Sequence, residues 1–195
     1  SLMEALPHDG EPAAAALVML GRHAEAATLG PVATSALILA LDHESAADRA
    51  AAAAALATLA DDDVIVALAR ALGDADDTVR ATASASLGTL GAALAAPALQ
   101  ALLTDFVPTV REAAASALAQ LGEAGHTVLA GGLKHQAPES RAISAWGLGL
   151  LGPAAAASDG VLADLLSSDD EADVREQAAG ALAHTDGEAG DHALL

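Results

Sequence analysis

Hydrophobic and polar positions follow a pattern that recurs along most of the chain. An arginine returns in steps of 31, 31, 30 and 34 residues, and each time a leucine follows it seven residues later. Three positions further on comes a second leucine, whose place is taken by Thr185 in the last unit. Agreement across several columns predicts a tandem repeat of one structural unit. The arginines are Arg49, Arg80, Arg111, Arg141 and Arg175, and the first leucines are Leu56, Leu87, Leu118, Leu148 and Leu182.

Each unit is expected to end in an amphipathic helix. A small residue three positions after the arginine shares one helical stripe with the leucines at seven and ten. Gly91, Gly122 and Gly152 close three of the units, and a closing glycine suits the left-handed backbone that ends many helices. An apolar segment before each of these helices predicts a first helix, joined to the second by a short polar turn. These segments are 31–41, 64–72, 97–103, 128–133 and 161–166.

One helix pair cannot bury its own apolar face, so neighbouring pairs must stack. The pattern therefore predicts an all-α fold, a right-handed α-solenoid that runs through the whole chain, 1–195. It has about five helix-pair repeats. Residues 1–30 are expected to hold a partial repeat and a longer connection, and 187–195 the start of a further repeat or a cap. The complete repeats are expected at about 31–60, 61–91, 92–122, 123–152 and 153–186, and the irregular ends indicate a portion of a longer array.

The repeat resembles the HEAT family, more closely its phycobilisome-lyase-like subgroup. Residues 97–105 (PALQALLTD) followed by 110–122 (VREAAASALAQLG) carry the resemblance, which covers about residues 31–186. It implies that an aspartate in the turn, six residues before the arginine, forms a ladder of hydrogen bonds with it along the stack. His43 and His135 occupy this ladder position in the first and fourth repeats, so the ladder is expected to be incomplete there. The residues that keep the spacing are Asp74 and Arg80, Asp105 and Arg111, and Asp169 and Arg175, while Arg141 follows His135.

The composition of the chain limits the classes of function that it can have. Twenty-seven acidic residues against eight basic ones give a formal charge of −19, which repels nucleic acid and anionic membranes. The acidic bias with a single lysine, Lys134, resembles proteins of a halophilic cytoplasm. The absence of cysteine excludes a disulfide framework, a thiolate zinc site and a cysteine nucleophile. No apolar run is expected to span a bilayer and no signal peptide is recognised, so we expect a cytoplasmic location.

Several short motifs resemble chemical sites but fit the repeat better. The glycines of 147–152 match the dinucleotide fingerprint, yet they lie within a predicted second helix rather than between a strand and a helix. The pair His43-Glu44 resembles the dipeptides of di-iron hydroxylases built from HEAT repeats, but one pair supplies too few ligands. Acidic turns such as 61–63 lack the ligand order of a calcium loop and suit helix capping. Serines at 84, 86, 116 and 144 fill small-residue columns as packing residues. We therefore predict no catalytic, cofactor-binding or metal-binding residue.

The surface most suited to binding is the face of the second helices opposite the leucine stripe. In the HEAT architecture this face is concave. Its positions lie one, five, eight and twelve residues after the arginine, and they hold mostly Ala and Gly. Trp146 stands among these small side chains beside Ser116, with Glu112 and Glu176 at the edge. One interpretation packs Trp146 into a gap between repeats, where Gly147 and Gly149 make room. The other exposes it as an anchor for a partner.

These features favour a non-enzymatic module that binds a protein partner on its concave face. A groove lined by Ala and Gly accepts a helix or an extended segment, and Glu112 and Glu176 favour a basic partner. The partner itself is not identified by the sequence. One alternative is an accessory or lyase-type protein for phycobilin attachment, which the subgroup resemblance implies. Another is a structural spacer without a groove ligand. A lesion-binding HEAT-like enzyme would need a basic face, which the acidic composition disfavours.

Overall fold

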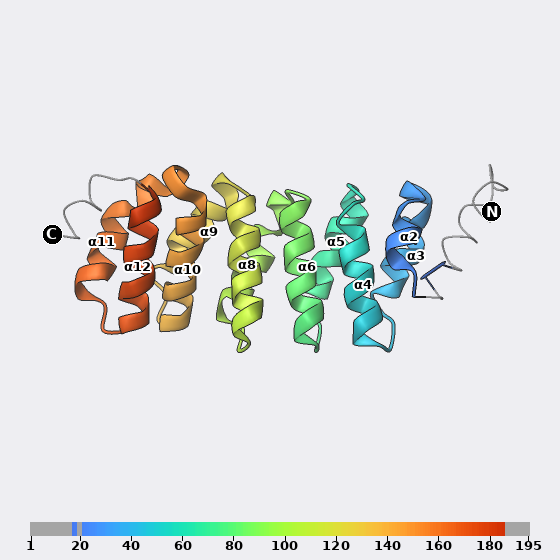
Figure 1. Cartoon of the computed structure of the whole chain (residues 1–195), viewed down its shortest axis with the longest axis horizontal. Helices are drawn as coiled ribbons and strands as arrows, with labels where there is room; N and C mark the ends of the chain where they lie inside the picture. The colour runs from blue at the N-terminus through green and yellow to red at the C-terminus, as the bar shows by residue number, and fades with distance from the viewer. Residues whose placement is uncertain (1–16, 19–20, 186–195) are drawn as a thin grey trace. The chain divides into compact units, whose positions relative to one another are not determined.

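The computed structural model describes residues 17–18 and 21–185, and within these ranges every regular element is a helix (Figure 1). The all-α, helix-pair prediction is confirmed. Backbone contacts divide the chain into two compact units, unit 1 up to Leu90 and unit 2 from Gly91 onward. The division falls at the predicted boundary between the second and third repeats. A single continuous solenoid stays a prediction. The end segments predicted at 1–30 and 187–195 lie largely or wholly outside the described residues.

The described part of unit 1 contains two helix pairs and, before them, the short helix α2. Helix α4 packs between α2 and α6, while α3 packs against α4 and α5 packs against α6. Figure 1 shows α4 and α6 side by side with α5 behind them. The second helices thus form one layer and the first helices the other. The elements are α2 (His23–Ala27), η1 (Gly30–Ala33), α3 (Thr34–Ala40), α4 (Ala46–Leu56), α5 (Asp62–Ala71) and α6 (Asp77–Thr89).

Up to residue 185, unit 2 contains three helix pairs with the same two layers. Helix α10 packs between α8 and α12, α9 packs against α8 and α10, and α11 packs against α12. Three short 3-10 helices complete the first-helix layer. The elements are η2 (Ala93–Ala95), α7 (Ala96–Ala101), η3 (Leu102–Thr104), α8 (Pro108–Gln120), α9 (Glu123–Gly132), α10 (Pro138–Leu151), η4 (Gly152–Ser158), α11 (Asp159–Ser168) and α12 (Ala172–Thr185).

Local sequence explains where the helices begin and end. The Asp76 carboxylate accepts hydrogen bonds from the backbone N–H groups of Thr78 and Val79, at 2.9 and 3.2 Å, and so caps α6. Pro108 and Pro138 open α8 and α10, at a position where a helix does not need the missing N–H. The closing glycines all have a positive φ, but ψ values of −125° for Gly122 and −137° for Gly152 place these two outside the left-handed helical region. Their φ values are 62° for Gly91, 60° for Gly122 and 56° for Gly152.

The repeated leucines form the core, as their spacing predicts. Those seven residues after the arginine are all buried: Leu56, Leu87, Leu118, Leu148 and Leu182. Small residues three after the arginine are buried too, which lets the helices approach closely. At the closest contact, a Cβ placed on Gly125 of α9 would lie 1.7 Å from the backbone oxygen of Leu118 in α8. The core therefore consists of closely packed helices with Ala, Gly and Leu between them, and it does not depend on large aromatic side chains.

One stretch passes a length and composition test for a membrane span, contrary to the sequence expectation. Helical residues run from Pro138 to Ser168 with a mean hydropathy of 1.2. In the structure this stretch is α10, η4 and α11, and Gly152, with a φ of 56°, separates α10 from the segment that follows. Its longest single α-helix is α10, with 14 residues, shorter than the roughly 20 that a spanning helix needs.

Candidate functional site

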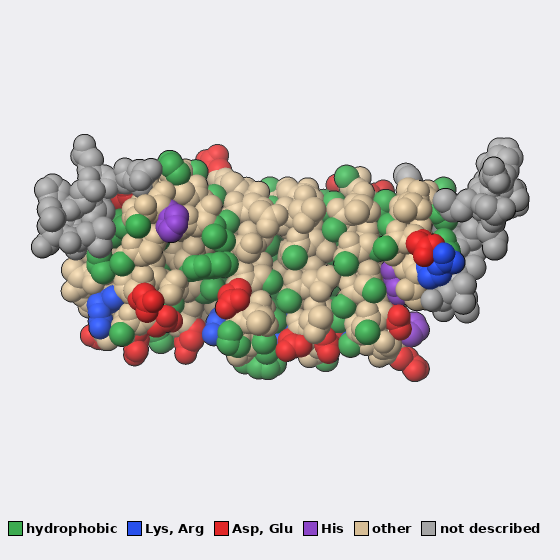
Figure 2. All heavy atoms as spheres, viewed as in Figure 1, with side chains coloured by type: hydrophobic (Ala, Val, Ile, Leu, Met, Phe, Trp, Pro, Cys, Tyr) green, Lys and Arg blue, Asp and Glu red, His purple; other side chains and the backbone are tan. Residues whose placement is uncertain are grey.

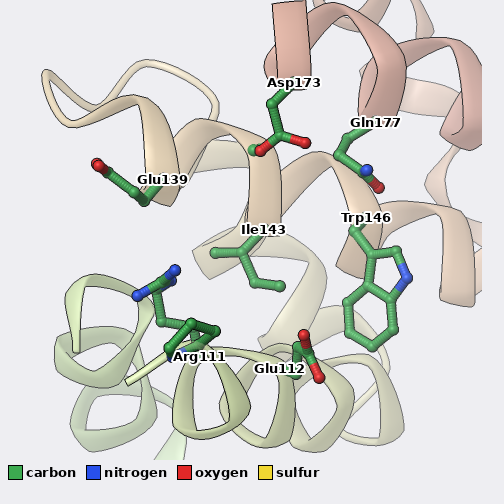
Figure 3. Close-up of a pocket in the computed structure, with 9 residues that line it drawn as sticks. Arg111, Glu112, Glu139, Ile143, Trp146, Asp173 and Gln177 are labelled. Carbon is green, nitrogen blue, oxygen red and sulfur yellow. The ribbon is translucent and has the colours of Figure 1, made fainter. Parts of the chain in front are cut away.

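An open groove crosses the second-helix layer of unit 2, over α8, α10 and α12 (Figure 3). Its volume is about 450 Å³. Ile143 and Trp146, one helical turn apart on α10, provide its largest apolar surfaces. Glu112 on α8 lies beside the six-membered ring of Trp146, and Asp173 on α12 faces the groove from the other side. The lining residues are Pro108, Arg111, Glu112, Glu139, Ala142, Ile143, Trp146, Asp173 and Gln177.

The structure places Trp146 in the groove, with its side chain half-buried. The neighbouring glycines do not make room for the indole. A Cβ on Gly147 would lie 2.8 Å from Leu129 Cδ2, and one on Gly149 would lie 3.2 Å from the Ala181 Cα. The glycines therefore serve the approach of α9 and α12 to α10. Part of the indole remains available to a ligand in the groove.

The groove has mixed charge with an excess of carboxylates. Glu112, Glu139 and Asp173 face one guanidinium group, that of Arg111. None of the three carboxylates forms an ion pair with another side chain within residues 17–18 and 21–185. In Figure 2, Asp and Glu side chains also gather along the edge of the face where the turns before the second helices lie. The local field thus attracts cations to the groove.

Two of the predicted partner-binding residues line this groove, and two lie outside it. Trp146 and Glu112 line it, whereas Ser116 is half-buried elsewhere on α8 and Glu176 is exposed elsewhere on α12. Sequence reasoning missed the residues two before and two after the arginine, which are Glu139, Ile143, Asp173 and Gln177. These columns lie on the same side of the helical wheel as the predicted ones, so the periodicity alone could have found them.

The repeated arginine lies in the first turn of each second helix. Its side chain binds backbone oxygens of the loop that precedes that helix. Nη1 of Arg80 donates to the carbonyl oxygens of Asp74 and Ala75, at 2.9 and 3.1 Å. Nη1 of Arg111 donates in the same way to the Asp105 carbonyl oxygen at 2.7 Å. Nη1 of Arg175 donates to the Asp169 carbonyl oxygen at 2.6 Å. The spacing of six residues therefore reflects a hydrogen bond from the arginine to the backbone oxygen of the residue at the ladder position. That bond does not depend on which side chain the residue carries.

The carboxylate at the ladder position instead binds the arginine of the preceding repeat. Nε and Nη2 of Arg49 each donate to the carboxylate of Asp74 at 2.7 Å. Arg141 binds Asp169 in the same two-bonded way, at 2.7 and 2.8 Å. These hydrogen bonds lower the pKa of Asp74 and of Asp169 below the ordinary value and raise the pKa of both arginines. The ladder thus connects one repeat to the next.

The two histidines keep the turn but lack a carboxylate. Where the ladder position holds an aspartate, its carboxylate also accepts a hydrogen bond from the N–H group two residues later, as Asp105 does from Val107 at 2.9 Å. His43 Nδ1 accepts the Ser45 N–H at 3.2 Å, and His135 Nδ1 accepts the Ala137 N–H at 3.1 Å. Arg49 and Arg141 still bind the backbone oxygens of these two turns. The carboxylate is missing at the predicted positions, but Arg49 and Arg141 of the same two repeats still hold aspartates. His135 instead leaves Arg111 of the preceding repeat without a carboxylate.

The remaining motifs have structural settings. Gly147 and Gly149 lie within α10, and Gly152 ends it, so they do not form a phosphate-binding loop. His43 lies in a turn, 3.3 Å from the Asp48 carboxylate. Sequence reasoning missed that His126 Nε2 lies 3.1 Å from the hydroxyl of Ser158 in the next repeat. Ser158 is only 4% exposed, which favours a packing contact over a nucleophile open to substrate.

Comparison with known families now gives the fold a name. Residues 34–119 match the family model of HEAT repeats. This segment consists of HEAT repeats. No curated protein matches the chain in sequence. The matched segment includes the turns of Arg49, Arg80 and Arg111 and all but the last three of the residues that carry the resemblance seen in the sequence.

Solved structures extend the HEAT-repeat likeness over most of the chain. The archaeal HEAT-like repeats protein from Thermococcus onnurineus NA1 has a TM-score of 0.59 at 18% identity, over 90% of this chain and 80% of that one. A chain of the complex of CpcE and CpcF of phycocyanin lyase from Nostoc sp. PCC7120 has a TM-score of 0.52 at 25% identity, over 94% and 74%. Kap121p bound to Nup53p has a TM-score of 0.55 at 16% identity, over 87% of this chain and 21% of that one.

Proposed function

We propose that this protein is a non-enzymatic HEAT-repeat module that binds a protein segment in the groove of α8, α10 and α12. The observation that carries the proposal is the half-buried Trp146 in an open groove with Ile143 beside it. Tryptophan is enriched among residues that dominate binding energy, since it buries a large surface at little entropic cost. HEAT repeats in other proteins bind protein partners, as Kap121p does with Nup53p.

Charge favours a segment with at least one basic side chain. Glu112 and Trp146 line the same side of the groove, and a Lys or Arg side chain placed between them gains both an ion pair and a cation–π contact. Asp173 adds a second carboxylate on the α12 side. The net charge of −19 draws such a segment in from a distance, most strongly at low salt.

The sole tryptophan allows a direct test, because the chain has no tyrosine and its fluorescence reports on Trp146 alone. Peptides are selected from a displayed random library against the intact chain and are then titrated while the emission is followed. The expected peptides carry at least one basic side chain, shift the emission and bind more weakly as salt increases. Glu112→Gln should weaken binding about tenfold, a cost of the size of a charge-assisted hydrogen bond.

Two controls complete this test. Glu123→Gln alters an exposed carboxylate of α9 outside the groove and should leave binding unchanged. Trp146→Ala should abolish the interaction while the helical circular dichroism signal stays intact. If this variant loses stability but keeps its peptides, Trp146 is a packing residue, and the groove proposal is wrong. Selection of no peptide at all would favour the structural spacer.

A second candidate function is an accessory role in phycobilin attachment, which the likeness to the CpcE and CpcF complex favours. The identity of 25% is spread over most of both chains. Mixing the protein with free phycocyanobilin tests it. A stoichiometric shift of the bilin absorption band would move this candidate ahead, and an unchanged spectrum at saturating protein would remove it.

A further inference from the structure

The ladder has one arginine that lines the groove and lacks its carboxylate. In Arg49 and Arg141, Nη1 donates to backbone oxygens of the turn in the same repeat. Their Nε and Nη2 groups donate to the carboxylate of an aspartate in the next repeat. Arg111 keeps only the first of these contacts, to the Asp105 carbonyl oxygen. In the part of the chain that the structure describes, no carboxylate lies within ion-pair distance of Arg111. Its Nε and Nη2 groups are therefore available donors.

His135 explains why this carboxylate is missing. It occupies the ladder position that would serve Arg111, and its Nδ1 is engaged by the Ala137 N–H. An imidazole has no pair of oxygens for the two parallel donors of a guanidinium group. Asp74 and Asp169 serve Arg49 and Arg141, whereas position 135 offers Arg111 no carboxylate.

Arg111 also lies where a ligand can reach it. Figure 3 shows its guanidinium group beside Ile143, on the side of the groove away from Trp146. Arg111 and Glu139 thus lie toward one side of the groove, and Glu112 and Trp146 lie toward the other, with the apolar Ile143 between them. This arrangement is complementary to a segment that carries charges of both signs.

We propose that an acidic side chain of the bound protein segment completes the interrupted ladder by pairing with Arg111. The proposal rests on the function proposed above and adds to it the chemistry of the partner. The partner's Asp or Glu carboxylate accepts from Nε and Nη2 of Arg111, as Asp74 does from Arg49. A basic side chain of the same segment lies between Glu112 and Trp146. A purely basic segment leaves Arg111 unpaired, and a purely acidic one is repelled by Glu112, Glu139 and Asp173.

The test measures how Arg111 and the peptide's acidic residue depend on each other. Peptides selected as above are remade with Gln in place of Glu, or Asn in place of Asp, and titrated against wild type and Arg111→Lys. We expect the amide peptide to bind wild type about tenfold more weakly and to bind Arg111→Lys as well as its acidic parent does. Arg175→Lys is the matched control, because Arg175 makes the same turn contacts outside the groove.

A second variant tests the same idea from within the protein. His135→Asp supplies a carboxylate at the ladder position, which should compete with the peptide for Arg111 and raise the thermal midpoint. His43→Asp is its control, because Gly10 stands where an arginine would precede it. Equal loss on amidation with wild type and Arg111→Lys overturns the inference, even when Trp146 and Glu112 still matter for binding. Failure of every peptide to bind overturns the proposed function as well.

Discussion

Arg141 and Asp169 join the fourth repeat to the fifth through two hydrogen bonds of 2.7 and 2.8 Å. The Asp169 side chain is 5% exposed, and its carboxylate also accepts the Glu171 N–H at 3.1 Å. One aspartate thus shapes its own turn and holds the preceding repeat. Because the pair is shielded from water, breaking it leaves a guanidinium group with unsatisfied donors, which costs more than the loss of a surface ion pair.

Asp169→Asn should therefore lower the free energy of unfolding of unit 2 by about 1–3 kcal/mol. The amide keeps the size of the side chain but loses the charge and one acceptor. Urea unfolding followed by circular dichroism measures the change. Asp170→Asn is the control, since this exposed neighbour offers only its backbone oxygen to Arg175. Equal stability of the two variants would contradict the role given to the Arg141 pair.

Acid should weaken the ladder in a defined window. The arginine partners lower the pKa of Asp74 and Asp169 below the ordinary 3.8. A carboxyl with a lowered folded pKa contributes stability that is fully present above 3.8 and is lost as the pH falls through the folded value. We expect the unfolding free energy to fall below about pH 4, and to fall less steeply in Asp169→Asn. Parallel profiles of wild type and variant would refute this assignment.

Gly125→Ala should disrupt the packing of α9 on α8. The new Cβ would lie 1.7 Å from the Leu118 backbone oxygen, and a backbone atom cannot move aside as a side chain can. We expect a loss of about 3 kcal/mol or more, seen as a lower thermal midpoint. Gly180→Ala is the matched change in α12, where nothing lies within 4 Å of the added Cβ. It should stabilise by about 0.5–1 kcal/mol, through helix propensity.

Ser86→Ala should reveal a bond that the sequence does not. The Ser86 hydroxyl of α6 donates to the Ala53 carbonyl oxygen of α4 at 2.9 Å, in the core of unit 1. Its loss should cost about 1 kcal/mol in chemical denaturation. Ser84 is equally buried but donates to Arg80 of its own helix, so Ser84→Ala should be nearly neutral. A neutral Ser86→Ala would restore the simple packing role expected for both serines.

Much of the fold could be predicted because its rules are local and periodic. The leucine column, the closing glycines and the turn spacing each follow from helix geometry, and the structure has all three. The direction of the ladder was harder to predict. A spacing of six residues says that Asp74 and Arg80 are related, but only the fold shows that the Asp74 carboxylate binds Arg49.

The groove was predictable only in part for a related reason. Trp146 is conspicuous in a chain with almost no aromatics, so composition alone draws attention to it. Glu139 and Asp173 lie on the expected side of the helical wheel, but the wheel does not show that their two helices bring them to the same groove. They become part of a site because α10 and α12 pack beside each other. Such lateral relationships are absent from a one-dimensional pattern.

The arginine of each repeat has two separable tasks, closing its turn through Nη1 and reaching the next repeat through Nε and Nη2. A change at the ladder position, such as His135, alters the second task and leaves the first intact. A substitution at this one position can therefore weaken or strengthen the contact between two neighbouring repeats while each helix pair keeps its structure. A repeat protein of this kind can gain a new recognition point through a single codon change in a turn.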